Sequence, residues 1–243
     1  MRPLRVLIAC EFTGTVRRAF DRLGHDVWSC DLRRADDGSN RHIIGDVRDV
    51  LNDRWDLMVV AHPPCTRLCN SGVRWLNDPS KMKNCGDDFT DEERAIWSTL
   101  DTEGKKVMIW RKLDEGAAIF SDLWNAPIER IAVENPVMHK HAKALIRNFE
   151  PHAQSVQPWH FGDWEKKRTC LWLRGLEPLQ LQFPTLDAAR SGLGLPEDAT
   201  PADRVHKMAP GADRCKERSR FFDGIANAMA EQWGGYSLRA MAV

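Results

Sequence analysis

Several features that would classify a protein quickly are missing from this sequence. Positive and negative charges balance, with 35 Lys and Arg against 35 Asp and Glu, so overall charge gives no indication of nucleic-acid binding, and any such contact must come from a local patch. No apolar run approaches the length of a membrane-spanning helix, and the N-terminus does not have the shape of a signal peptide. We therefore expect a cytoplasmic protein with no membrane partner.

Cysteine motifs are also sparse. The seven cysteines are odd in number and scattered, which suits a reducing compartment better than a disulfide framework. A zinc site made of His62, Cys65, Cys69 and Cys85 is an alternative, but their spacing is irregular and the sequence has no Cys-x-x-Cys pair. We therefore expect no bound metal.

The chain does contain an alternation of strand and helix patterns along its 243 residues, a length that suits one sizeable core. This alternation predicts an α/β fold with a mostly parallel sheet covered on both faces. Strands are expected at 4–9, 25–30, 42–44, 57–61, 128–133, 153–157 and 169–173. Helices are expected at 13–23, at 91–124 with a break near Gly104, and at 217–232, with loops at 66–90 and 177–216.

The most informative segment is Pro63-Pro64-Cys65. The apolar run before it predicts a buried strand, and two prolines cannot continue a strand ladder. The thiol therefore stands where the chain leaves the carboxyl end of a strand, which is where open α/β sheets hold their chemistry. A cysteine held at such a corner is a candidate nucleophile.

The turn after the first strand, Glu11-Phe12-Thr13-Gly14, lies where a nucleotide-like ligand crosses an open α/β sheet. Asp31 ends the second strand, 17 residues after Gly14, and an acidic residue there can bind the two hydroxyls of an adenosine ribose. The turn has a single glycine, so it is not a dinucleotide fingerprint. An ordinary strand-to-helix turn with a solvated Asp31 stays open as the alternative.

The order of motifs resembles the cytosine-5 DNA methyltransferases, in particular a compact group common in phages and prophages. The similarity covers most of the chain. The matching segments are Glu11–Gly14, Asp31, Gly45-Asp46-Val47, Pro63-Pro64-Cys65 with Ser71-Gly72, Glu134-Asn135-Pro136, Phe161-Gly162 with Lys166-Lys167-Arg168, and Arg218-x-Arg220 with the helix around Asn227. The resemblance implies a Rossmann-like S-adenosylmethionine-dependent methyltransferase fold, with one catalytic domain over residues 1–243.

The resemblance also implies roles for individual residues. Cys65 would attack carbon 6 of cytosine, Glu134 would protonate ring nitrogen 3, and Arg168 would bind the carbonyl oxygen of the base. Further contacts with the base would come from Pro64, Ser71, Asn135 and Lys166. The cofactor S-adenosylmethionine would be held by Glu11, Phe12, Thr13, Gly14, Asp31, Asp46, Pro63 and Asn227. The implied partner is DNA with an extruded cytosine, and a monomer is favoured.

Three departures from the family pattern shape these expectations. Glu11 replaces a glycine, and it either holds the amino group of the methionine moiety or has a structural role. The Arg-x-Arg pair of the family appears as Lys166-Lys167-Arg168. Only residues 177–216 stand in place of a recognition domain, so sequence specificity should be short or absent.

The two expected loops would then hold the DNA. Residues 66–90 should act as a lid over the extruded base. Phosphate contacts should come from Arg204, Lys207, Arg214 and Lys216. The alternatives are an amino-group DNA methyltransferase, transfer of another carbon unit to carbon 5, a free nucleotide as substrate, and a module that binds cofactor or DNA without catalysis.

Overall fold

The computed structural model describes residues 2–82, 85–86, 88–204 and 221–235. The chain divides into two compact units. Unit 1 comprises Met1–His62, Pro127–Glu134 and His152–Val243, and unit 2 comprises Pro63–Ala126 and Asn135–Pro151. The expectation of one catalytic domain over the whole chain stays a prediction.

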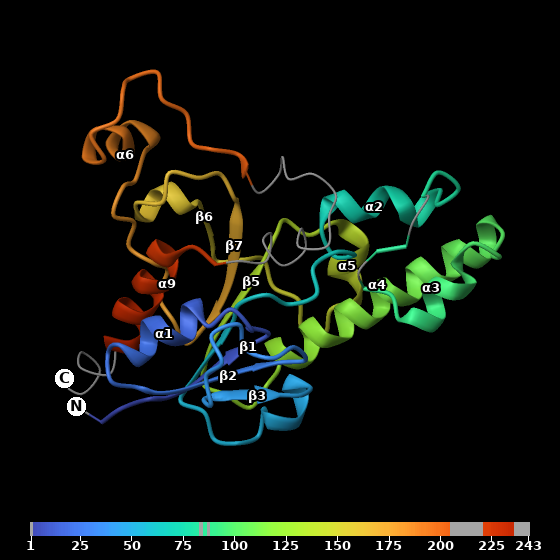
Figure 1. Cartoon of the computed structure of the whole chain (residues 1–243), viewed down its shortest axis with the longest axis horizontal. Helices are drawn as coiled ribbons and strands as arrows, with labels where there is room; N and C mark the ends of the chain where they lie inside the picture. The colour runs from blue at the N-terminus through green and yellow to red at the C-terminus, as the bar shows by residue number, and fades with distance from the viewer. Residues whose placement is uncertain (1, 83–84, 87, 205–220, 236–243) are drawn as a thin grey trace. The chain divides into compact units, whose positions relative to one another are not determined.

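Unit 1 is built on a seven-stranded sheet with the order β3-β2-β1-β4-β5-β7-β6 (Figure 1). The strands are β1 (Arg5–Ala9), β2 (Asp26–Asp31), β3 (His42–Ile44), β4 (Leu57–Val60), β5 (Arg130–Asn135), β6 (Gln154–Val156) and β7 (Thr169–Arg174). Strands β1 to β5 pair in parallel, whereas β6 and β7 pair antiparallel. The predicted α/β fold with a mostly parallel sheet is therefore confirmed.

Strand β7 runs opposite to its neighbour β5. At the end of β7 the Arg174 guanidinium donates a hydrogen bond of 2.7 Å to the carbonyl oxygen of Ile128, just before β5 begins. The next residue, Gly175, lies so close to the Glu129 carbonyl oxygen that a Cβ would be 2.6 Å from it. Because the end of β7 lies beside the start of β5, the start of β7 lies beside the end of β5.

In its described residues, unit 1 contains the helices α1 (Thr15–Asp21), α6 (Leu186–Gly192) and α9 (Asp223–Met229), with short turns at η1 (Val47–Val50), η2 (Pro158–Phe161) and η3 (Ala230–Gly234). Helices α1 and α9 lie side by side (Figure 1). Apolar side chains from β1, β4, α1, α9 and η3 form one buried cluster that includes Ile8, Val59, Phe20, Ile225 and Trp233. Burial of each such side chain contributes roughly 1.5–3 kcal/mol.

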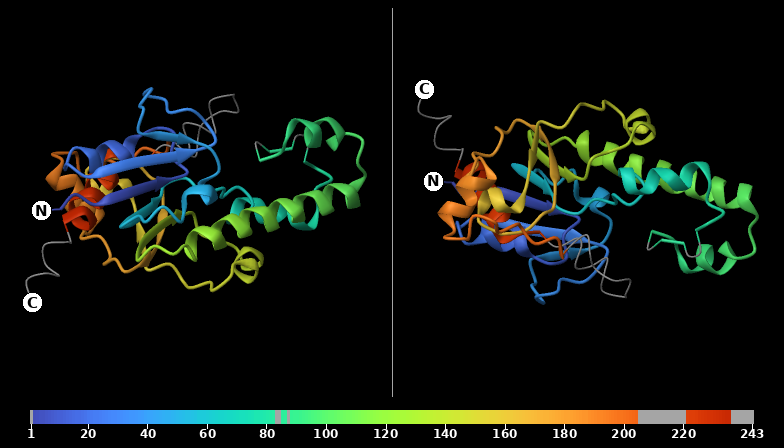
Figure 2. Two further views of the ribbon diagram at one scale, coloured as in Figure 1. Left: turned by 90° about the horizontal axis from the view of Figure 1, so that it is seen from below. Right: turned by 90° about the horizontal axis from the view of Figure 1, so that it is seen from above.

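Unit 2 is helical, with α2 (Asn70–Asn77), α3 (Asp91–Trp97), α4 (Thr102–Trp124) and α5 (Lys140–Leu145). Helix α3 folds back beside the start of α4 (Figure 2), and Lys112 of α4 pairs with Glu93 of α3 at 2.8 Å. The predicted break near Gly104 lies slightly earlier. The Asp101 carboxylate accepts a hydrogen bond of 2.8 Å from the Gly104 amide, so this glycine belongs to the first turn of α4.

Two segments predicted as loops contain helices, and these predictions were wrong. Helix α2 lies within residues 66–90, and α6 lies within residues 177–216. Both are short and largely polar, so they show little hydrophobic periodicity. Thr185 caps α6, and Leu76 of α2 is buried, so local caps and tertiary contacts stabilise these helices. Helix α5 was also not predicted, and among the described residues the C-terminal helix begins at Asp223. No helix in the described ranges is both long and apolar enough to cross a membrane.

Candidate active site

The strand order of unit 1 has a switch point at β1 and β4. From β1 the chain continues to β2 and β3 on one side of the sheet, and it then returns to β4 on the other side. Ligands of open α/β sheets bind outside the carboxyl ends of the strands at such a point. In unit 1 the turn Cys10–Gly14 follows β1, and His62 follows β4, so these residues flank the expected ligand crevice.

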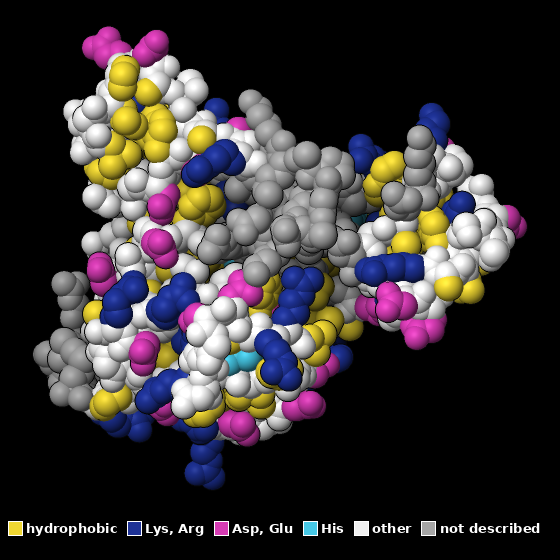
Figure 3. Space-filling model, viewed as in Figure 1, with side chains coloured by type: hydrophobic (Ala, Val, Ile, Leu, Met, Phe, Trp, Pro, Cys, Tyr) yellow, Lys and Arg dark blue, Asp and Glu magenta, His cyan; other side chains and the backbone are white. Residues whose placement is uncertain are grey.

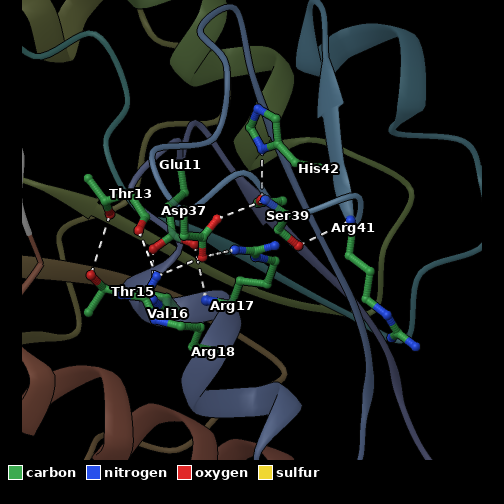
Figure 4. Close-up of polar contacts among 11 residues, drawn as sticks. Glu11, Thr13, Thr15, Val16, Arg17, Arg18, Asp37, Ser39, Arg41 and His42 are labelled. Carbon is green, nitrogen blue, oxygen red and sulfur yellow. Dashed lines mark hydrogen bonds and ion pairs between the residues drawn. The ribbon is translucent and has the colours of Figure 1, made fainter.

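Glu11 caps helix α1 (Figure 4). Its carboxylate accepts hydrogen bonds from the backbone amides of Val16 at 2.7 Å and Arg17 at 3.0 Å. The side chain is fully buried, and this burial raises its pKa to about 7, although the two amides and the nearby arginines lower it. Gly14 precedes α1 with φ of 71°, a left-handed conformation that favours glycine. Of the two roles expected for Glu11, these contacts match the structural one, because both carboxylate oxygens accept amides of α1.

An ion-pair network that the sequence did not reveal holds the next loop against α1 (Figure 4). The buried guanidinium of Arg17 pairs with the Asp37 carboxylate, and Arg18 pairs with the same carboxylate at 2.8 Å. Arg18 also donates to the Thr13 carbonyl at 3.0 Å. The backbone of the turn after β1 is thus bonded to α1 at Thr13, within the predicted cofactor segment.

The two predicted acidic cofactor residues differ in their bonding. Burial is the main influence on Asp31 and raises its pKa, and its carboxylate accepts a hydrogen bond of 2.9 Å from the Arg33 amide. Asp46 accepts from both the amide and the guanidinium of Arg48, which hold its pKa below the ordinary value. Asp46 therefore caps the η1 turn, and Asp31 is the half-buried carboxylate at this edge.

Two apolar side chains beside Asp31 were not singled out from the sequence. Leu32 is 76% exposed and Ile44 is 56% exposed. Asp31 and Ile44 are partners in the β2–β3 register, so both apolar residues lie at the carboxyl end of these strands. Exposed aliphatic side chains at a ligand edge can pack against a flat base. The sequence signal was the apolar residue that directly follows the acidic strand end.

Glu134 is only 6% exposed at the end of β5. Burial raises the pKa of its carboxyl to about 7, and the Lys167 ammonium lowers it. Burial and Lys167 also hold the pKa of His62 well below its ordinary value. The β4–β5 register pairs Val60 with Val133. His62 lies two residues after Val60 and Glu134 directly follows Val133, so both lie at the carboxyl ends of adjacent strands. Unit 1 therefore brings an imidazole, a carboxyl and an ammonium to one edge of the sheet.

Lys166 and Arg168, unlike Glu134, are not buried. Both side chains are exposed, and the Arg168 guanidinium donates to the Ser155 hydroxyl of β6 at 3.4 Å. Asn227 does not reach the turn after β1. Its amide oxygen accepts a hydrogen bond of 2.5 Å from the guanidinium of Arg22, which directly follows the last residue of α1. That end of the helix lies about 10 Å along the helix axis from Gly14. The structure thus places Asn227 away from the other predicted cofactor residues.

Cys65 belongs to unit 2 and begins a tight turn. Its carbonyl oxygen accepts from the amides of Leu68 at 3.0 Å and Cys69 at 3.1 Å. Helix α2 then returns so close that a Cβ on Gly72 would lie 2.4 Å from the Thr66 carbonyl oxygen. Only glycine permits this approach, which gives Ser71-Gly72 a structural reason. The Ser71 hydroxyl itself contacts the Cys69 sulfur at 3.0 Å.

The turn after Cys65 is anchored within unit 2. The buried guanidinium of Arg67 binds both oxygens of Asp88, at 2.7 and 3.0 Å. The Arg67 carbonyl is 2.7 Å from the His139 ring. These contacts fix the backbone two residues after the predicted nucleophile, and they hold the start of the segment that was expected to be a lid.

Three further predicted residues are placed as follows. Pro63 is buried and Pro64 is exposed. Asn135, in unit 2, is fully buried, and its amide donates to the Pro136 carbonyl at 2.9 Å. Its buried Oδ1 atom has no hydrogen-bond partner among the described residues.

The predicted phosphate contacts are only partly described. Arg204 pairs with the buried carboxylate of Glu165, so its charge is already balanced. Lys207, Arg214 and Lys216 lie outside the described residues. On the face drawn in Figure 3, cationic and acidic side chains are interspersed.

No group of three or more His, Cys, Asp or Glu side chains that could hold a metal ion occurs in the described part of the chain. No protein-family model matches this chain, and no curated protein matches it.

Proposed function

We propose that this chain is an S-adenosylmethionine-dependent methyltransferase that modifies carbon 5 of cytosine in DNA. The observation that carries the proposal is the buried carboxyl of Glu134 at the end of β5, with a pKa of about 7. The chain leaves the neighbouring strand β4 through His62 and two prolines to Cys65. Activation of a cytosine ring requires both a thiol nucleophile and an acid that is protonated near neutral pH.

The edge of the sheet fits an adenosine ligand without a phosphate. Glu11 satisfies two amides at the start of α1, so this helix end is closed to a phosphate, and the carboxylate would repel one. Asp31 would bind the ribose hydroxyls, and Leu32 and Ile44 would pack against the base. Phe12, Thr13, Gly14, Asp46 and Pro63 would complete the pocket. S-adenosylmethionine, once bound, would supply a methyl group attached to a sulfonium.

The chain's own residues would activate the base. The Cys65 thiolate would form a bond to carbon 6, and Glu134 would donate its proton to ring nitrogen 3, which makes carbon 5 nucleophilic. After carbon 5 has been methylated, loss of its proton to a base would restore the ring double bond, and Cys65 would leave as a thiolate. Glu134 would recover the proton from nitrogen 3. A pKa of about 7 suits both directions of this transfer.

The carbonyl oxygen of the base would need a cation, which the segment Lys166–Arg168 offers. The family resemblance assigns this role to Arg168. Between β7 and α9 lie 48 residues, 175–222, which are too few for an independent recognition domain. Modification should therefore depend on at most a short sequence context.

Mass spectrometry of DNA nucleosides from cells that express the chain tests this proposal. Wild-type protein should produce 5-methylcytosine and should form a covalent adduct with DNA that contains 5-fluorocytosine. Cys65→Ala should do neither, while its binding of S-adenosylmethionine in calorimetry stays close to that of the wild type. Methylation of an exocyclic amino group, or full activity of Cys65→Ala, would overturn the proposal.

A further inference from the structure

Lys167 and Arg168, the two cations just before β7, project from opposite faces of the sheet. Strand β7 lies between β5 and β6 in the sheet. The Arg168 guanidinium donates to Ser155 on β6, and the Cys170 sulfur lies 3.5 Å from the same hydroxyl. Arg168 and Cys170 are two residues apart, as expected for side chains on the same side of an extended chain. Arg168 therefore projects from the face of the sheet that carries Ser155 and Cys170.

Lys167 projects from the opposite face, which it shares with Leu171 of β7 and, on β5, with Ala132 and Glu134. Because β7 is antiparallel to β5, the residues before β7 lie beside the end of β5, where Glu134 is buried. The charge of Lys167 acts on Glu134 and also on His62, which follows β4. The Nε2 atom of His62 is buried and has no hydrogen-bond partner among the described residues. A polar atom left in this state beside an ammonium indicates a place where a polar ligand completes the bonding.

The backbone of Lys167 is held in place. Its amide donates to the Gln157 side chain at 3.0 Å, and its carbonyl accepts from the Thr169 hydroxyl at 3.2 Å. The side chain therefore starts from a fixed point, and an ammonium on a flexible stem can still reach a small acceptor. The neighbouring Lys166 is exposed.

We propose that Lys167, rather than Arg168, is the cation that binds the carbonyl oxygen of the cytosine ring beside Glu134. This inference rests on the proposed function and deepens it. When the thiolate adds to carbon 6, electron density moves onto the ring nitrogen and the carbonyl oxygen. Glu134 would neutralise the first by donating its proton, and Lys167 would stabilise the second by charge and hydrogen bonding. Lys167 also keeps the pKa of Glu134 from rising further.

The test compares Lys167→Met, Lys167→Arg and Arg168→Met, with Lys143→Met as a control at an exposed lysine of α5. Two quantities are measured: the single-turnover rate on cytosine-containing DNA as a function of pH, and the titration of the Glu134 carboxyl by carbon NMR. Lys167→Met should lower the rate at least about a hundredfold, the size of a typical loss of one charge-stabilising donor. Lys167→Arg should react at least about tenfold faster than Lys167→Met, because the positive charge is kept.

The pH dependence separates this role from a merely structural one. The rate requires protonated Glu134 and so falls as pH rises through its pKa. Without Lys167 this pKa should rise, and the alkaline limb of the rate profile should move to higher pH together with the NMR titration. Arg168→Met should lower the rate less than roughly tenfold and leave the titration of Glu134 in place, and Lys143→Met should change neither quantity.

Two results would overturn the inference while the proposed function stands. One is an active wild type in which Lys167→Met keeps its rate and Arg168→Met loses it. The other is an unchanged Glu134 titration in a folded Lys167→Met. If the wild type modifies no cytosine, the proposed function fails and the role of Lys167 in it fails too.

Discussion

Strands β1 and β5 both lead into a buried glutamate, and the surroundings of the two carboxyls differ. Glu11 follows β1 and Glu134 lies near the end of β5. Burial raises both pKa values to about 7. Glu11 accepts two helix amides and lies near two arginines, whereas, among the described residues, Glu134 has no such amides and its pKa is lowered by the charge of Lys167.

The difference shows that burial and pKa alone do not identify a catalytic acid. The oxygens of Glu11 are used by the first turn of α1, so its carboxylate holds the fold together. Glu134 lies beside an ammonium and an imidazole with a buried, unpartnered nitrogen. Perturbed groups gather at functional sites and also in structural networks, and here the bonded partners separate the two cases.

The largest expected effect concerns stability and pH. The pKa of each glutamate is about 7 in the folded chain, compared with an ordinary value of 4.5. The folded chain therefore binds these protons more tightly than the unfolded chain, and the free energy of unfolding falls as pH rises from 4.5 to about 7. The difference amounts to about 3 kcal/mol for each group. Glu134→Gln should remove its share, as measured by urea unfolding at several pH values. An unchanged pH dependence would contradict the burial of an ionisable Glu134.

The next effect concerns catalysis. Glu134→Gln should lower the methylation rate at least about a hundredfold, because an amide cannot donate the proton that ring activation requires. DNA affinity should change little, since the amide keeps the shape of the side chain. Single-turnover kinetics and a DNA-binding titration measure the two quantities. Glu231→Gln, at an exposed site of η3, is the matched control. A wild-type rate in Glu134→Gln would remove this residue from the mechanism.

A third carboxylate extends the comparison to ligand binding. Asp31→Ala should weaken the binding of S-adenosylmethionine roughly ten- to a hundredfold, because two charge-assisted hydrogen bonds to the ribose would be lost. Calorimetry measures the affinity. Asp26→Ala, at the opposite end of the same strand, should keep it. Equal affinities in both variants would place the adenosine site elsewhere.

The smallest expected effect tests the capping role of Glu11. Glu11→Ala should lower the free energy of unfolding by about 1 kcal/mol, the usual loss when a side chain that caps a helix is removed. Glu11→Gln keeps one acceptor oxygen and should lose less. Thermal unfolding below about pH 4.5, where the carboxyl is protonated in the fold and the cost of burying its charge is absent, measures both. An unchanged or higher stability of Glu11→Ala at this pH would contradict the capping role.

The strands were predictable because each is a short apolar run that ends in polar residues. Strand β3 matches the prediction His42–Ile44 at both ends. Helices α2 and α6 were missed because seven- or eight-residue helices with few apolar residues give no clear periodicity. Their stability comes from a cap such as Thr185, and from a buried contact such as Leu76, that only the folded chain supplies.

The candidate site was predictable in part for the same reason. A residue that follows a strand, such as Glu11, can be placed at the carboxyl edge from the sequence alone. Which of three adjacent cations faces Glu134 depends on the direction of β7 and on side-chain alternation, and the family pattern favoured Arg168. Asn227 shows the converse, because its place on α9 was correct while its side chain bonds Arg22 at the far end of α1.

The sequence by itself determined the α/β architecture and the kinds of chemical group at the strand ends, because hydrophobic periodicity and chain-breaking residues act locally. Only the tertiary structure decided that Glu11 caps α1, that Asp46 is bonded to Arg48, and that the charge of Lys167 acts on Glu134. Hydrogen bonds and charge interactions depend on distance and burial between segments that are remote in the chain, and no local pattern encodes those quantities.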